Sequence, residues 1–220
     1  MKVLVFGATG LIGRGVLHEC LDHPQVHDVL SIGRRKTGVV HPQLREHLHD
    51  DFTNFSGIAD MLKGFDACFW CLGISSFGMD EASYTRITYD FTMAAADVLT
   101  QASPVLCFCF VSGAGTDHTQ RSRSMWARVK GRTENALKEK SFPRLFLFRP
   151  GFISCRGVKD PRSIFVQALD KTFAPVLRAI GAQTSNQEIG RAMIAVVSGQ
   201  AAPQIIDSKE INHLADALSP

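Results

Sequence analysis

The chain has 220 residues, a formal net charge of +3 at pH 7 and 45% hydrophobic residues. This length suits one domain, and the apolar fraction is too high for a disordered chain. The small net charge excludes a chain-wide case for nucleic-acid binding, so we expect no nucleic-acid partner. No run of about 18 apolar residues occurs, and Gly7 comes too early for a signal-peptide core, so we expect a cytoplasmic protein without a membrane span.

Apolar runs alternate with helical periodicities along the first two thirds of the chain. The predicted strands are 3–6, 26–32, 44–49, 66–71, 105–111 and 145–148, and the predicted helices are 11–21, 58–63, 81–101 and 125–140. This alternation predicts an α/β fold, a doubly wound parallel sheet of Rossmann type.

The last third carries only helix signals, at 162–169, 174–180, 188–197 and after Ser208. Ser185 is a plausible N-cap for the third of these helices, with Glu188 placed to complete a capping box. We therefore expect a single domain over residues 1–220, in which 151–220 forms a small C-terminal helical region.

Three glycines, Gly7, Gly10 and Gly13, separate the first predicted strand from the first helix. In this context Gly7 permits a tight turn, Gly10 lets the backbone approach a diphosphate, and Gly13 lets helix and strand pack closely. The helix N-terminus adds free N–H groups and partial positive charge. The alternative is a structural turn without a ligand, and we predict a dinucleotide site instead. Its expected contacts are Gly7, Thr9, Gly10, Leu11, Ile12 and Gly13.

The end of the second strand selects between nicotinamide cofactors. An NAD site usually places a carboxylate about 20 residues after the glycines, to bind the ribose hydroxyls. Here Gly33 lies at that distance from Gly13, and Arg34 and Arg35 follow it. A guanidinium can bind a 2′-phosphate through paired, charge-assisted hydrogen bonds. The pattern favours NADP(H) over NAD(H), although two solvated arginines on a loop would give the same sequence.

Two further strand ends are expected to line the same crevice, because ligands of doubly wound sheets lie at the carboxyl ends of the strands. Asp51 and Phe52 follow the third strand, where an acidic side chain could meet the adenine amino group. Leu72 and Gly73 follow the fourth strand, where backbone could approach the nicotinamide ribose.

The order of these motifs resembles that of the short-chain dehydrogenase/reductase superfamily, in particular its atypical, extended-type members, often described as NAD(P)-binding or epimerase-like. The resemblance covers residues 1 to about 155 and rests on 7–13, Asp51-Phe52, Leu72-Gly73, Val111-Ser112, Val129-Lys130-Gly131 and Arg149-Pro150-Gly151. It implies that Lys130 holds the nicotinamide ribose, that Ser112 orients the substrate oxygen, and that 151–220 supplies the substrate pocket. It also implies cofactor contacts from Pro150, Gly151 and Phe152.

The position that holds the catalytic tyrosine in active relatives, four residues before the lysine, is Trp126 in this chain. Residues four apart on a helix share a face, so Trp126 and Lys130 could both reach the nicotinamide pocket. An indole N–H only donates hydrogen bonds and has no accessible anionic form near neutral pH, so it cannot replace a phenol in proton transfer. The substitute donors we consider are Ser112, Tyr84, His118 or a water.

Three functions fit these residues. The first is an NADP(H)-dependent oxidoreductase acting on an unidentified small molecule, as the retained Ser112 and Lys130 suggest. The second is a cofactor-loaded scaffold that senses NADPH and NADP⁺, as the replacement of the tyrosine by Trp126 suggests. The third and lowest-ranked is epimerisation of a nucleotide sugar, which also requires the missing tyrosine. We expect a monomer or homodimer.

Other signals have plainer interpretations. Cys68 and Cys71 are three apart on a predicted strand and point to opposite faces, so the cysteines are expected to be structural thiols and no metal site is predicted. The eight histidines show no recognisable metal spacing. Seven basic and two acidic residues lie between positions 121 and 140, a pattern typical of a solvated helix face.

Overall fold

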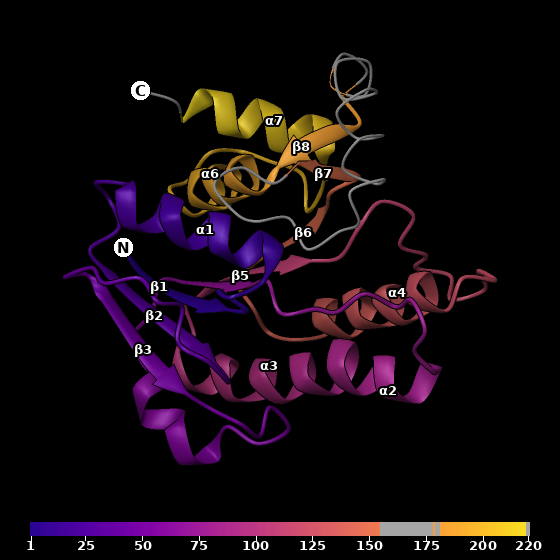
Figure 1. Ribbon diagram of the computed structural model, residues 1–220, viewed down its shortest axis with the longest axis horizontal. Helices are drawn as coiled ribbons and strands as arrows, with labels where there is room; N and C mark the ends of the chain where they lie inside the picture. Colours follow the sequence, from indigo (N-terminus) through magenta and orange to yellow (C-terminus); the bar gives the residue numbers. More distant parts are fainter. Residues whose placement is uncertain (155–177, 179–180, 219–220) are drawn as a thin grey trace.

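The computed structural model describes residues 1–154, 178 and 181–218. Its centre is a sheet of seven parallel strands in the order β3-β2-β1-β4-β5-β6-β9 (Figure 1). This order confirms the predicted doubly wound α/β fold, because the chain winds outward from β1 in both directions. The strands are β1 (Lys2–Phe6), β2 (Asp28–Gly33), β3 (Leu44–Leu48), β4 (Ala67–Trp70), β5 (Cys107–Val111), β6 (Arg144–Arg149) and β9 (Ile205–Asp207).

Helices cover both faces of the sheet, and each face has its own apolar core (Figure 1). One face packs against α1 (Leu11–Asp22), α6 (Asn186–Val197) and α7 (Ser208–Ala217). The other face packs against η1 (Ser56–Leu62), α3 (Phe91–Ala102) and α4 (Met125–Lys138). The alternating side chains of the central strands are buried on both sides, as expected for parallel strands between two helical layers.

Helix α6 fixes the first turn of α1. Its first residue, Asn186, is fully buried and donates a side-chain hydrogen bond to the Leu11 carbonyl oxygen at 3.2 Å. The capping box predicted for this helix is confirmed: the Ser185 side chain accepts from the Glu188 backbone N–H, and the Glu188 carboxylate accepts from the Ser185 backbone N–H. The C-terminal part of the chain therefore braces the helix that follows the glycine-rich turn.

Several elements differ from the sequence predictions. The segment predicted as one helix over 81–101 is divided into α2 (Glu81–Thr85), the π-helix η2 (Arg86–Asp90) and α3, and the helix predicted at 58–63 is the 3-10 helix η1. Strand β9 and the two-stranded sheet of β7 (Phe152–Ser154) and β8 (Gln183–Ser185) were not predicted, because three-residue strands are too short to show a period. The helix predictions at 162–169 and 174–180 lie outside the described residues, apart from position 178.

The described cysteines bear no disulfide. Cys20, Cys68, Cys107 and Cys109 are buried, Cys71 is half-buried, and all five are free. Cys68 packs in one core and Cys107 and Cys109 in the other, which places the thiols of β4 and β5 on both sides of the sheet. Within the described part of the chain, no group of three His, Cys, Asp or Glu side chains could hold a metal ion.

Candidate functional site: the crevice at the carboxyl ends of the strands

The glycine-rich turn after β1 leaves no room for side chains at two positions. Gly7 has a φ of +78°, and a Cβ there would lie 2.7 Å from the Cys71 carbonyl oxygen. A Cβ on Gly13 would lie 2.1 Å from the Gly7 carbonyl oxygen. Helix α1 begins after Gly10 without a side-chain cap and without an acidic residue in its first turn. Its N-terminal N–H groups and partial positive charge therefore remain available to an anion.

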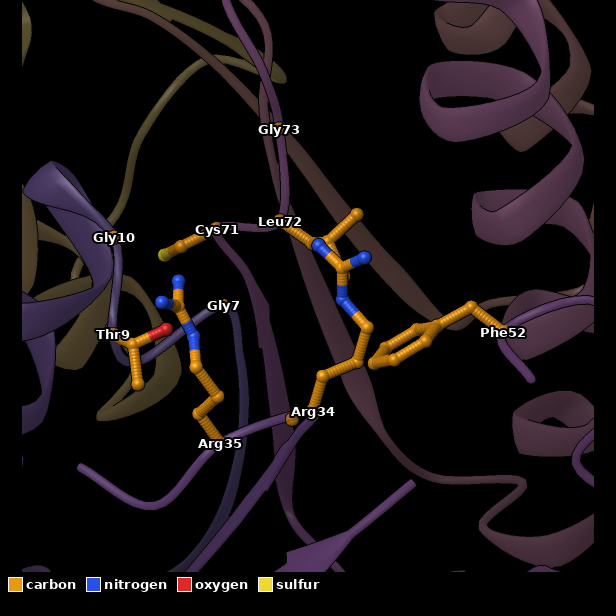
Figure 2. A pocket seen from close by; sticks show the side chains of 10 residues that line it. Gly7, Thr9, Gly10, Arg34, Arg35, Phe52, Cys71, Leu72 and Gly73 are labelled. Atoms are coloured by element: carbon orange, nitrogen blue, oxygen red, sulfur yellow. The ribbon is translucent and has the colours of Figure 1, made fainter. Parts of the chain in front are cut away.

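A cavity of about 180 Å³ opens beside this turn (Figure 2). Arg35 extends toward Thr9 and Cys71, whereas Arg34 extends toward Leu72 and lies beside the ring of Phe52 (Figure 2). The cavity is lined by Gly7, Thr9, Gly10, Gly33, Arg34, Arg35, Phe52, Cys71, Leu72 and Gly73. The structure thus brings together residues from the ends of β1, β2 and β4, three neighbouring strands of the sheet.

The lining of this cavity is positively charged. Arg34 and Arg35 are exposed, and neither forms an ion pair with a described residue. Among the residues that the structure describes, no carboxylate lines the cavity. Burial raises the pKa of Cys71 to about 12, so its thiol stays neutral near pH 7. The cavity therefore presents two unpaired guanidinium groups and helix N–H groups, which together suit an anionic ligand.

A second cavity of about 430 Å³ continues the first and shares Arg34, Phe52, Leu72 and Gly73 with it. Apolar walls enclose much of it, and three polar side chains add to Arg34. The further lining residues are Asp50, Ile74, Ser83, Arg86, Ile87 and Phe91. Apolar side chains with a few polar groups are typical of sites for small molecules and cofactors.

The carboxylate that lines this second cavity belongs to Asp50, and Asp51 does not line it. The Asp51 carboxylate instead accepts hydrogen bonds from the backbone N–H and the hydroxyl of Thr53, at 3.0 and 2.5 Å. These hydrogen bonds lower the pKa of Asp51. Arg86 was also missed in the sequence, because it reaches the cavity from the π-helix η2, whose register no local pattern predicts.

Trp126 and Lys130 converge beside the loop that follows β5. A Cβ placed on Gly113 would lie 3.9 Å from each of Lys130 Nζ, Trp126 Cζ3 and the Pro150 carbonyl oxygen. Lys130 Nζ donates a hydrogen bond to the Ser112 carbonyl oxygen. Burial lowers the pKa of Lys130 from 10.5 to about 8, against the opposing effect of the nearby Glu134 carboxylate. The shared helical face predicted for Trp126 and Lys130 is thus observed.

The Ser112 hydroxyl is held inside the protein. Ser112 is only 4% exposed, and its hydroxyl donates to Glu134 Oε1 at 2.6 Å. Glu134 is fully buried and also accepts two hydrogen bonds from the Arg149 guanidinium, one of them 3.0 Å long. Because a hydroxyl has one proton, Ser112 cannot donate to a substrate while it donates to Glu134. Glu134 lies one helical turn after Lys130, a spacing that could have indicated a partner on the same face.

The other residues that the resemblance implies do not line the two cavities. The Pro150 carbonyl oxygen accepts from the Ala114 N–H at 2.9 Å, and the Gly151 N–H donates to the Ser208 hydroxyl at 2.8 Å. Phe152, on β7, is 51% exposed. Leu11, Ile12 and Gly13 form the first turn of α1 beside the first cavity.

Two of the substitute proton donors considered from the sequence, Tyr84 and His118, lie outside both cavities. Tyr84 is buried, and burial raises the pKa of its phenol. His118 is exposed on the loop after β5, where its carbonyl oxygen accepts from Asn135. The chain's other tyrosine, Tyr89, lies under the guanidinium of Arg132 at 4.1 Å. None of these three side chains lines either cavity.

A profile of the NAD dependent epimerase/dehydratase family matches residues 3–124, more than half of the 220 residues. The chain belongs to this family. The match spans the glycine-rich turn, both arginines and the whole of the β4–α3 connection, but it ends just before α4, which carries Trp126 and Lys130.

Known relatives agree with this assignment. Protein HTATIP2 of Rattus norvegicus is 28% identical over 225 residues, which cover 97% of this chain and 88% of that protein. Protein fmp52-2, mitochondrial, of Aspergillus oryzae is 27% identical over 197 residues, covering 87% and 84%. The solved structure of UDP-glucuronic acid 4-epimerase from Bacillus cereus in complex with NAD superposes with a TM-score of 0.69 at 15% identity, covering 94% and 78%.

These matches confirm the resemblance to atypical members of the short-chain dehydrogenase/reductase superfamily and the Rossmann-type fold. They also bear on location. None of the helices that the structure describes is long and apolar enough to cross a membrane. Because one relative is named as mitochondrial, the cytoplasmic location expected from the sequence stays a prediction.

Proposed function

We propose that this protein binds NADP(H) and signals its redox state, and does not reduce carbonyls by the mechanism of its superfamily. The observation that carries the cofactor assignment is the pair Arg34 and Arg35 at the end of β2, where an NAD site usually places an acid. No described carboxylate lines the cavity around them. Phosphate recognition by paired guanidinium groups is charge-assisted and geometrically specific.

The residues around the two cavities fit the adenosine and diphosphate parts of the dinucleotide. Gly7 and Gly13 keep side chains out of the turn, so that the diphosphate can lie against the N-terminus of α1. The second cavity would hold the adenine ring, with Asp50 in reach of its amino group and Arg34 beside the 2′-phosphate. The nicotinamide half would then extend across the carboxyl ends of β4 and β5, toward Lys130.

Among the described residues, we find no side chain placed to donate the proton that the acid–base chemistry of the superfamily needs. When bound, NADPH supplies a hydride, and reduction of a carbonyl then needs a proton on the oxygen. Trp126 cannot give that proton, and the Ser112 hydroxyl is committed to Glu134. This combination supports a sensing role. Epimerisation of a nucleotide sugar ranks lowest because it would need the tyrosine phenol whose position Trp126 occupies.

Two measurements test this proposal. Calorimetric titration of the pure protein should show tighter binding of NADPH than of NADH, and no heat with either would overturn the proposal. Hydrogen exchange of the protein saturated with NADPH or with NADP⁺ should differ at the loop 112–124 or at α4. Identical exchange in the two states would contradict the sensing role.

An oxidoreductase acting on an unidentified small molecule is the second candidate, and the retained Lys130 favours it. Such an enzyme would suit acceptors whose reduced forms are stable anions, such as quinones, because these acceptors can take their proton from water. Absorbance assays of NADPH consumption with quinones, imines and carbonyls would detect it. If Trp126→Tyr gains carbonyl reduction that the natural protein lacks, the sensing role is favoured; steady turnover by the natural protein favours the enzyme.

A further inference from the structure

The side chain of Lys130 places a half-buried ammonium group at the carboxyl end of β5. It donates to the Ser112 carbonyl oxygen and lies with the Trp126 ring around Gly113. The sheet order puts β2, with the two crevice arginines at its end, on one side of β1, and β4 and β5 on the other. A dinucleotide with its adenosine half at β2 must therefore bring its nicotinamide half toward this ammonium group.

The charge of Lys130 has no direct counterion in the described part of the chain. The nearest carboxylate, Glu134 on α4, is bound by the Arg149 guanidinium from β6 and by the Ser112 hydroxyl. Trp126, on the preceding turn of α4, and the backbone of Ser112 and Gly113, after β5, bring no ionisable group. The charges of Glu134 and Arg149 cancel each other, so the cluster of Lys130, Glu134 and Arg149 retains a net charge of +1.

We propose that Lys130 makes this site discriminate NADPH from NADP⁺ by charge, favouring the reduced cofactor. The nicotinamide ring is neutral in NADPH and carries one positive charge in NADP⁺, whereas the phosphates of the two forms are the same. A fixed positive charge beside the ring therefore repels only the oxidised form, and partial removal from water strengthens that repulsion. This inference rests on the proposed NADP(H) site and assigns the residue that would let the protein report redox state.

The pH dependence of this preference has a defined sign. Because burial lowers the pKa of Lys130 to about 8, the ammonium is charged below that pH and neutral above it. The preference for NADPH is then complete only well below pH 8 and is lost as the pH rises through the Lys130 pKa. By linkage, bound NADP⁺ lowers the pKa of Lys130 further.

The test measures the dissociation constants of both cofactors by calorimetry, from one unit below to one unit above the Lys130 pKa of about 8. The quantity of interest is their ratio, because protonation of the 2′-phosphate affects both forms alike and cancels. We expect the ratio of NADP⁺ to NADPH dissociation constants to fall by roughly tenfold as Lys130 deprotonates. A ratio that stays constant over this range would overturn the proposal.

Matched variants separate charge from packing. Lys130→Met, with the charge removed, should show the low ratio at every pH, and Lys130→Arg should keep the high ratio even above the lysine pKa. Lys138→Met, an exposed position on the same helix, should behave like the natural protein. Circular dichroism checks folding, and the wild-type pH profile remains decisive if a variant fails to fold. If the natural protein binds neither NADPH nor NADP⁺, the NADP(H) site itself is refuted.

Discussion

The buried cluster of Glu134, Arg149 and Ser112 allows a quantitative prediction. Glu134 has no exposed surface, and the Arg149 side chain is 17% exposed. Arg149→Met leaves the carboxylate buried with one hydroxyl as partner, and breaking a buried ion pair in this way costs about 3–5 kcal/mol of unfolding free energy. Ser112→Ala removes one hydrogen bond to a charged group, which costs about 1.5–3 kcal/mol.

The double variant Glu134→Leu/Arg149→Met removes both charges and should recover much of the loss, because apolar replacement of a buried pair is often neutral. Urea unfolding followed by circular dichroism gives all of these values. Glu134→Gln completes the series, and we expect it to cost less than Arg149→Met because the partly exposed guanidinium can still reach water. If the unfolding free energy of Arg149→Met lies within about 1 kcal/mol of that of the natural protein, the cluster is not buried as described and Ser112 is free to face a substrate.

Two other predictions concern the glycine-rich turn and the capping box. Gly13→Ala should weaken NADPH binding and cost about 1–3 kcal/mol of stability, because its Cβ would meet backbone atoms, whereas Gly57→Ala, with open space around it, should be nearly neutral in urea unfolding. Burial alone would raise the pKa of Glu188, but hydrogen bonds from Arg178 and Ser185 outweigh it and hold the pKa at about 2, below the ordinary 4.5. Stability from Glu188 should therefore be present above pH 4.5 and fall away toward pH 2, and a natural protein with the same acid profile as Glu188→Gln would contradict this.

Local patterns were enough to predict the elements that build the crevice at the carboxyl ends of the strands. The spacing of Gly7, Gly10 and Gly13 between an apolar run and a helical period predicted β1, the turn and α1, because each glycine has a separate steric reason. The arginines after β2 were predicted to lie in the same crevice, since the carboxyl ends of parallel strands meet at one edge.

The remaining features depend on contacts that no local pattern carries. A one-residue difference in a loop decides that Asp50 lines the second cavity, whereas Thr53 binds the carboxylate of Asp51. The partner of Ser112 lies 22 residues away on another element, so the resemblance suggested a substrate-facing hydroxyl where the structure shows a buried one. Strand β9 forms by pairing with β6, and its own three residues show no pattern that predicts a strand.

The proposed function depends on binding of the 2′-phosphate by Arg34 and Arg35. Calorimetric affinities for NADPH and NADH test it in the natural protein, in Arg34→Ala/Arg35→Ala and in Lys36→Ala, an adjacent exposed cation that lines neither cavity. Each charge-assisted bond is worth about 1.5–3 kcal/mol, so the double variant should bind NADPH at least roughly tenfold more weakly and lose the preference over NADH. Equal affinity of the natural protein for both cofactors, or an unchanged preference in the double variant, would contradict the account.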